Sequence, residues 1–174
     1  MTGRYIFPNT IRFILVLLLQ VFVLNNINLF GWASPMVYPF LILLLPINLP
    51  VSIVLLSAFF AGYTVDFWSN GGGIHAASLT LMAFLRKPLL TQLMPQSGYE
   101  KDELPTFVNQ GIGWFFIYSG IMLFIHHLMY FVLEAYSLSN FGLTLFRVLV
   151  SGIVSIMLYW IVSLTALPNR KKQR

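Results

Sequence analysis

The sequence predicts an all-α membrane protein, a compact bundle of six transmembrane helices that forms one domain over residues 1–174. Two observations predict this class. Of the residues, 58% are hydrophobic and only 9% are charged, whereas about a quarter of the residues in an ordinary soluble domain are charged. The apolar residues also gather in runs of roughly twenty, the number of helical residues needed to cross the hydrocarbon core of a bilayer.

The first predicted span covers residues 11–30. Gln20 lies in the middle of this apolar run, and Asn25 and Asn26 lie at its far end. Polar side chains inside a membrane usually hydrogen-bond a neighbouring helix. We therefore expect either that Gln20 bonds another helix while the asparagines meet interfacial water, or that the three form a polar patch for a ligand or partner.

Some thirty apolar positions follow, interrupted by Pro46-Ile-Asn48-Leu-Pro50. One straight helix of that length would overshoot the bilayer by about half. Proline removes a backbone donor and breaks helices. The pattern therefore predicts two short spans, 36–46 and 50–66, joined by a tight turn.

Three further spans are predicted at 74–90, 112–133 and 141–167. The stretch from 95 to 110 between the first two is the only long polar segment of the chain. With six spans and both termini in the cytoplasm, every basic residue except Arg147 falls on the cytoplasmic side, as the positive-inside rule requires. The turn between residues 66 and 74 then faces the exterior.

This turn is the most unusual part of the sequence, because an acid and three successive glycines interrupt apolar runs. The candidate residues are Gly62, Asp66, Ser69, Asn70, Gly73 and His75. An acid at the edge of a span is unfavourable unless something compensates for it. Either the polar side chains hydrogen-bond the free backbone groups of the turn, or they form an outward notch that receives a partner or a small ligand.

Glu134 and Arg147 flank the connection between the last two spans, and each charge alone would be unfavourable at that depth. We expect them to form an ion pair between the two helices. His126 and His127 are adjacent, so their side chains point about 100° apart on a helix and do not easily share one metal ion. Packing is the expectation for this pair, with a functional role as the alternative.

The sequence offers little for catalysis. It contains no cysteine, which excludes disulfides, thiolate metal sites and cysteine nucleophiles. No metal-binding His pair at helical spacing, nucleophile elbow or nucleotide-binding glycine loop is found. The net charge of +5 lies at span ends and in the tail, so it concerns membrane topology and not nucleic acid. We expect neither an enzyme nor a bound cofactor.

A series of polar and small residues over nearly the whole chain resembles one known family. The series comprises Arg12-Phe-Ile-Leu, Gln20-Val, Leu24-Asn25-Asn26-Ile27, Pro35, Leu43-Leu-Leu-Pro46, Gly62-x3-Asp66-x2-Ser69-Asn70-x2-Gly73-Ile-His75-Ala76-Ala77, Phe84-Leu-Arg86, His126-His127, Phe131-x2-Glu134-Ala135 and Arg147-x3-Ser151. In these residues the chain resembles MreD, the rod-shape-determining membrane protein of bacteria. The pattern of glycine, aspartate and glycine-x-histidine is its most specific part.

This resemblance implies a non-enzymatic scaffold of the cell-elongation machinery in the bacterial inner membrane. Its expected main partner is MreC, and through MreC the MreB filament, a RodA-type glycan polymerase and a class B penicillin-binding transpeptidase. The family fold is similar to the substrate-binding subunits of energy-coupling-factor transporters. A small-molecule-binding subunit of a vitamin-type transporter is therefore the alternative, and a membrane enzyme using Asp66, His75 and water is a third.

Overall fold

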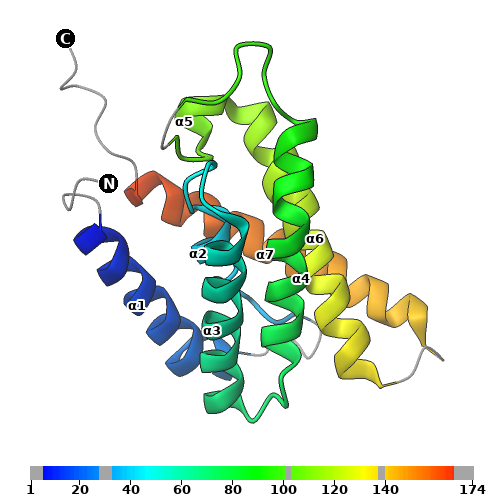
Figure 1. Cartoon of the computed structure of the whole chain (residues 1–174). Helices are drawn as coiled ribbons and strands as arrows, with labels where there is room; N and C mark the ends of the chain where they lie inside the picture. Colours follow the sequence, from blue (N-terminus) through cyan, green and yellow to red (C-terminus); the bar gives the residue numbers. More distant parts are fainter. Residues whose placement is uncertain (1–5, 28–32, 101–102, 137–139, 167–174) are drawn as a thin grey trace.

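The computed structural model describes residues 6–27, 33–100, 103–136 and 140–166, and within these ranges the regular structure is entirely helical. The helices in chain order are α1 (Ile6–Phe22), the 3-10 turn η1 (Leu24–Asn26), α2 (Phe40–Leu43), α3 (Val51–Ser69), α4 (Ile74–Gln92), α5 (Phe107–Gln110), α6 (Ile112–Ala135) and α7 (Phe141–Ala166). Figure 1 shows α3 and α4 as an antiparallel hairpin, with α1 beside α3 and with α7 crossing the other helices obliquely.

Three of these helices are long and apolar enough to cross a membrane: α3, α6, and residues Phe141–Ile161 of α7. The predicted first span, residues 11–30, corresponds to α1 and η1: α1 ends at Phe22, and the apolar helical stretch Phe13–Asn26 is shorter than the three spans above. Residues 28–30 of that prediction lie outside the described residues. The helix α4 is as long as α3, but it is less apolar because it carries Arg86 and Lys87. These lengths and compositions are those of a membrane protein. The basic tail and Arg4, on which the predicted orientation depends, lie outside the described residues.

The structure differs from the prediction over residues 36–46, where a transmembrane helix is expected. The only helix there is the four-residue α2, which rises about 6 Å. Prolines at 35, 39 and 46 explain the difference, because each lacks a backbone donor and restricts the residue before it. The chain from 33 to 43 is instead largely irregular and almost wholly buried.

The chain from residue 33 to residue 47 runs from one end of the bundle to the other. At one end, the ring of Phe22 lies 5.6 Å from that of Trp68, so the ends of α1 and α3 are close together. At the opposite end, the Ile47 amide donates to the carbonyl of Glu103 over 2.9 Å. Irregular backbone at membrane depth is tolerated where protein surrounds it, because no water is present to satisfy its polar groups. We call residues 33–39, the non-helical part, the buried segment.

Aromatic rings fill the space between the buried segment and the helices. The side chains of Phe40, Phe115 and Tyr159 are almost fully buried, and the Tyr159 ring stacks on the other two with centroid distances of 4.3 and 4.9 Å. The outward side chains are also apolar: Phe60, Phe67 and Met157 are each at least 60% exposed. Apolar residues both inside and outside are typical of a protein whose surroundings are lipid.

Candidate functional site

The predicted polar turn connects α3 to α4, and Asp66 organises it. The Asp66 carboxylate is buried, and it accepts hydrogen bonds from the backbone amides of His75 (3.1 Å) and Ala76 (2.8 Å). These amides belong to the first turn of α4, whose donors have no partner within the helix. A negative charge also complements the positive end of the helix dipole. Both oxygens of Asp66 therefore serve to begin α4.

The neighbouring residues provide the backbone geometry of this turn. Asn70 adopts the left-handed conformation with a φ of 54°, and Gly72 and Gly73 follow with φ values of 63° and 92°. A side chain at Gly71 would collide with Oδ1 of Asp66. The Ser69 hydroxyl donates to the carbonyl of Val65 over 2.7 Å, which satisfies an acceptor in the last turn of α3. Ser69 and Asn70 remain exposed.

Gly62 allows α3 and α4 to approach closely one turn below this cap. A β-carbon built at Gly62 would lie 2.5 Å from Cα of Ala76 and 2.7 Å from the carbonyl oxygen of His75. Real β-carbons do not come so near to backbone atoms. The glycine and the aspartate, four residues apart on one face of α3, therefore act on the same first turn of α4.

His75 belongs to a buried hydrogen-bonded chain centred on Tyr38. The Tyr38 hydroxyl lies 2.9 Å from Nδ1 of His75 and 2.6 Å from Nε2 of His126, and all three side chains are buried. A hydroxyl has one proton, so Tyr38 donates to one imidazole and accepts from the other. The buried segment, α4 and α6 are thus joined at one atom. Nδ1 of His126 is buried and has no partner among the described residues.

His127 makes separate contacts, with α7. Its Nδ1 lies 2.8 Å from the carbonyl of Leu123, and Nε2 lies 3.1 Å from the hydroxyl of Ser155. A carbonyl can only accept, so the proton of the neutral ring lies on Nδ1 and Ser155 donates to Nε2. The Ser155 oxygen accepts in turn from the Met36 amide over 3.1 Å. The adjacent histidines therefore bond different neighbours, in keeping with the expected packing role.

Gln20 bonds the buried segment, not another helix. Its Oε1 accepts from the amides of Val37 (2.7 Å) and Tyr38 (3.4 Å), and its Nε2 donates to Oδ1 of Asn25 (2.7 Å) and to the carbonyl of Pro35 (3.3 Å). Asn26 is exposed and bonds the carbonyl of Phe22. Gln20 and Asn25 thus act together, while Asn26 caps the end of its own helix. The side-chain amide of Gln20 pairs with backbone groups of the buried segment, as a neighbouring strand would in a sheet.

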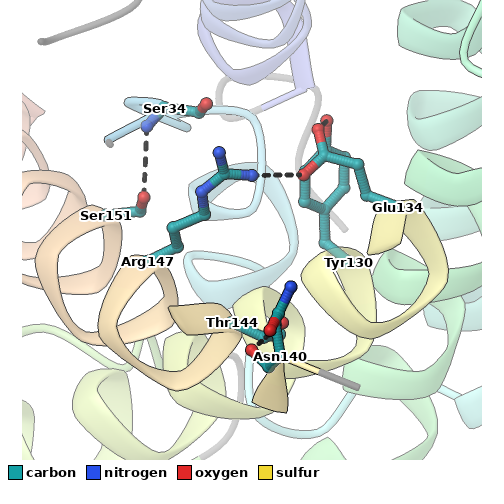
Figure 2. Close-up of polar contacts among 7 residues, drawn as sticks. All are labelled: Ser34, Tyr130, Glu134, Asn140, Thr144, Arg147 and Ser151. Carbon is teal, nitrogen blue, oxygen red and sulfur yellow. Dashed lines mark hydrogen bonds and ion pairs between the residues drawn. The ribbon is translucent and has the colours of Figure 1, made fainter. Parts of the chain in front are cut away.

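Glu134 and Arg147 lie together as predicted. Arg147 Nη1 is 3.8 Å from Oε2 of Glu134, and their side chains are 38% and 41% exposed. Figure 2 shows the guanidinium reaching across from α7 towards Glu134 and Tyr130 on α6. The Tyr130 hydroxyl lies 3.5 Å from Oε1 of Glu134. On the other side, Ser151 accepts from the amide of Ser34 over 3.1 Å.

Tyr130 connects the two predicted sites. Its ring centroid lies 4.8 Å from that of His75, so the α3–α4 turn and the Glu134–Arg147 pair occupy the same end of the bundle. Sequence reasoning did not identify Tyr130, although it lies four residues from both His126 and Glu134, the spacing of one helix face. Sequence reasoning also missed Tyr38, because its partners His75 and His126 are 37 and 88 residues away and no sequence pattern relates them.

Arg86 is a charged residue whose role differs from the sequence prediction. It is counted there as a cytoplasmic basic residue, but it is 97% buried. Its Nε donates to the Tyr118 hydroxyl over 3.0 Å, and Nη2 donates to the carbonyls of Leu45 and, over 3.4 Å, Pro46. These carbonyls follow α2, so a cation at this position complements the negative end of that short helix and holds the chain just after it.

Most of the predicted polar residues therefore contact the chain itself. Asp66, Gln20, Arg86 and Ser155 each bond backbone groups, and the histidines bond Tyr38 and Ser155. In the described part of the chain, no group of three side chains is arranged to hold a metal ion. The arrangement organises backbone that would otherwise be unpaired in a membrane.

Comparison of the chain with protein-family models, with curated proteins and with solved structures found no match.

Proposed function

We propose that this protein is a non-enzymatic scaffold of the MreD type, which holds MreC in the bacterial inner membrane and through it connects peptidoglycan synthesis to the MreB filament. The observation that carries the proposal is that the residues of the family pattern make structural contacts in this fold. Gly62, Asp66, Gly73 and His75 build one turn, while Gln20 and Ser151 hold the buried segment. These residues of the pattern each have a structural use in the fold, and this use supports the proposal.

The outer surface supports the same role. The face of α3 that points away from the bundle carries aromatic and aliphatic side chains: Ile53, Leu56, Phe60, Tyr63 and Phe67 are all between 48% and 68% exposed. Helices in a membrane associate through van der Waals packing and interhelical hydrogen bonds, not through a hydrophobic driving force. A scaffold for single-helix partners needs this kind of surface and little mass outside the bilayer.

The exposed edge of the α3–α4 turn is the proposed contact with MreC. Its available polar groups are the side chain of Asn70 and the hydroxyl oxygen of Ser69, which donates to Val65 but can still accept; the carboxylate of Asp66 is already used by α4. Ser69→Ala combined with Asn70→Gly removes both groups while glycine retains the left-handed backbone. This double variant therefore changes the surface and leaves the hairpin intact.

The test is affinity purification of the tagged protein from gently solubilised native membranes, followed by identification of what co-purifies. We expect MreC and the glycan polymerase with the wild type, and less MreC with the Ser69→Ala/Asn70→Gly variant at an unchanged melting temperature. Ser97→Ala, an exposed serine in the loop after α4, is the matched control. Recovery of a pair of ATPase subunits and a coupling subunit would overturn the proposal in favour of the transporter reading.

A further inference from the structure

The second polar group at this end of the bundle is the Arg147 cluster, which we define as Tyr130, Glu134 and Arg147. It lies where α6 ends and α7 has made about two turns (Figure 2). Unlike the other polar groups, its members are neither fully buried nor fully paired. The cluster therefore has hydrogen-bonding capacity that the fold does not use.

The pairing within the cluster is loose. The ion pair has a single contact, at 3.8 Å, and the Tyr130 hydroxyl is 3.5 Å from the carboxylate. Arginine carries five N–H donors. Nε of Arg147 is buried and has no partner among the described residues. By comparison, Asp66 makes bonds of 2.8 and 3.1 Å with both oxygens.

The position of the cluster points to lipid. Glu134 is one residue from the end of α6, at the level where a spanning helix leaves the hydrocarbon. Arg147 is six residues into α7, about 9 Å along its axis, and arginine side chains reach from such depths towards the headgroups. The side chains of Tyr136 and Phe141, at the facing ends of the two helices, are 88% and 48% exposed and give acyl chains an apolar surface.

The charges select a class of headgroup. A guanidinium matches a phosphate by presenting parallel donors, and a carboxylate accepts hydrogen bonds from a primary ammonium. We propose that the Arg147 cluster binds a zwitterionic phospholipid whose headgroup carries both a phosphate and a primary ammonium, that is, phosphatidylethanolamine. The phosphate accepts from the Nη groups of Arg147, whose side chain is 38% exposed, and the ammonium donates to Glu134 and Tyr130.

The carboxylate is what excludes other lipids. An anionic headgroup such as phosphatidylglycerol brings a phosphate but no cation, so Glu134 repels it. Phosphatidylcholine brings a cation without N–H groups, so it makes no hydrogen bond to Glu134 or Tyr130. The cluster should therefore bind phosphatidylethanolamine more tightly than phosphatidylcholine, although the two headgroups differ only in the methyl groups on the nitrogen.

The experiment uses the full chain, purified in detergent, stripped of lipid and titrated with dioleoyl phosphatidylethanolamine, phosphatidylcholine or phosphatidylglycerol, with binding read by native mass spectrometry. We expect phosphatidylethanolamine to bind about tenfold more tightly than phosphatidylcholine, because hydrogen bonds to charged groups are lost in the latter. Glu134→Gln should abolish this preference. Arg147→Lys keeps the positive charge for the ion pair but removes the parallel N–H donors of the guanidinium. It should therefore weaken binding of both phosphatidylethanolamine and phosphatidylcholine. Leu149→Ala, an exposed apolar position on α7, is the control and should change neither.

Equal binding of the three lipids to the wild-type protein would overturn the proposal. So would unchanged lipid preference in Glu134→Gln, which would leave the cluster with an ion-pairing role only. Soluble phosphoethanolamine is the last probe: if it competes at the concentration of the lipid itself, the site belongs to a soluble zwitterion and the lipid assignment is wrong.

Discussion

The close approach of α3 and α4 gives the sharpest prediction about stability. Replacing Gly62 with alanine adds one β-carbon, which would meet the Ala76 Cα at 2.5 Å and its amide nitrogen at 2.7 Å. Both are backbone atoms, so no side-chain rotation relieves the contact. The two helices must separate by about 1 Å to restore ordinary van der Waals distance.

Two costs follow from this separation. Overpacking of this kind costs roughly 1–3 kcal/mol. The separation also lengthens the two hydrogen bonds from Asp66 to α4, and loss of a helix cap costs roughly 0.5–2 kcal/mol. Alanine is better than glycine within a helix by roughly 0.5–1 kcal/mol, which offsets part of the loss. We therefore expect Gly62→Ala to lower the free energy of unfolding by about 0.5–4.5 kcal/mol.

Gly120→Ala in α6 is a matched control, because a β-carbon there meets no atom within 4 Å. This substitution should be neutral or stabilising by up to about 1 kcal/mol. Thermal unfolding in one detergent, followed by the fluorescence of the 4 tryptophans, measures both variants against the wild type. A Gly62→Ala protein that melts at or above the temperature of the Gly120→Ala protein would refute the reasoning about close approach.

Three further substitutions test the buried polar contacts. Tyr38→Phe removes the hydroxyl between two buried imidazoles and should lower stability by about 1–3 kcal/mol, whereas Tyr63→Phe, at an exposed position of α3, should not; equal melting temperatures would contradict the bridge. Gln20→Leu leaves the Val37 amide unpaired and should cost about 1–3 kcal/mol; protease resistance as high as that of the wild type would argue against a role in holding the segment. Arg86→Lys keeps the charge but cannot donate to Tyr118 and Leu45 in the geometry of the guanidinium, so we expect a lower melting temperature. A melting temperature equal to that of the wild type would show that charge alone is required.

The long helices were predictable because local signals bound them. Pro50 precedes α3, Gly73 precedes α4 and Gly111 precedes α6, and each apolar run between such breaks formed a helix within a few residues of its predicted ends. The hydrogen bonds of Asp66 are equally local, since its partners lie 9 and 10 residues away.

The buried segment was not predictable in the same way. The apolar composition of residues 36–46 is that of a transmembrane helix, and the feature that permits an irregular path over residues 33–39 is the presence of acceptors and donors on other helices. Tyr38 meets partners 37 and 88 residues away, and Ser34 meets one 117 residues away. No periodicity within residues 33–43 reports such contacts, so composition alone suggested a helix where proline and tertiary contacts produce none.

The dependence of the buried segment on α7 has a consequence for biosynthesis. The amides of Ser34 and Met36 find their acceptors on Ser151 and Ser155 of α7, which leaves the ribosome after α1 to α6. Until α7 is synthesised, those amides have no partner in lipid, where an unpaired polar group costs several kcal/mol. The segment must therefore wait in a wetter environment while the later helices insert. Insertion of the earlier helices and pairing of the buried segment are then separate events in time, and the arrival of α7 is the step that supplies the missing acceptors.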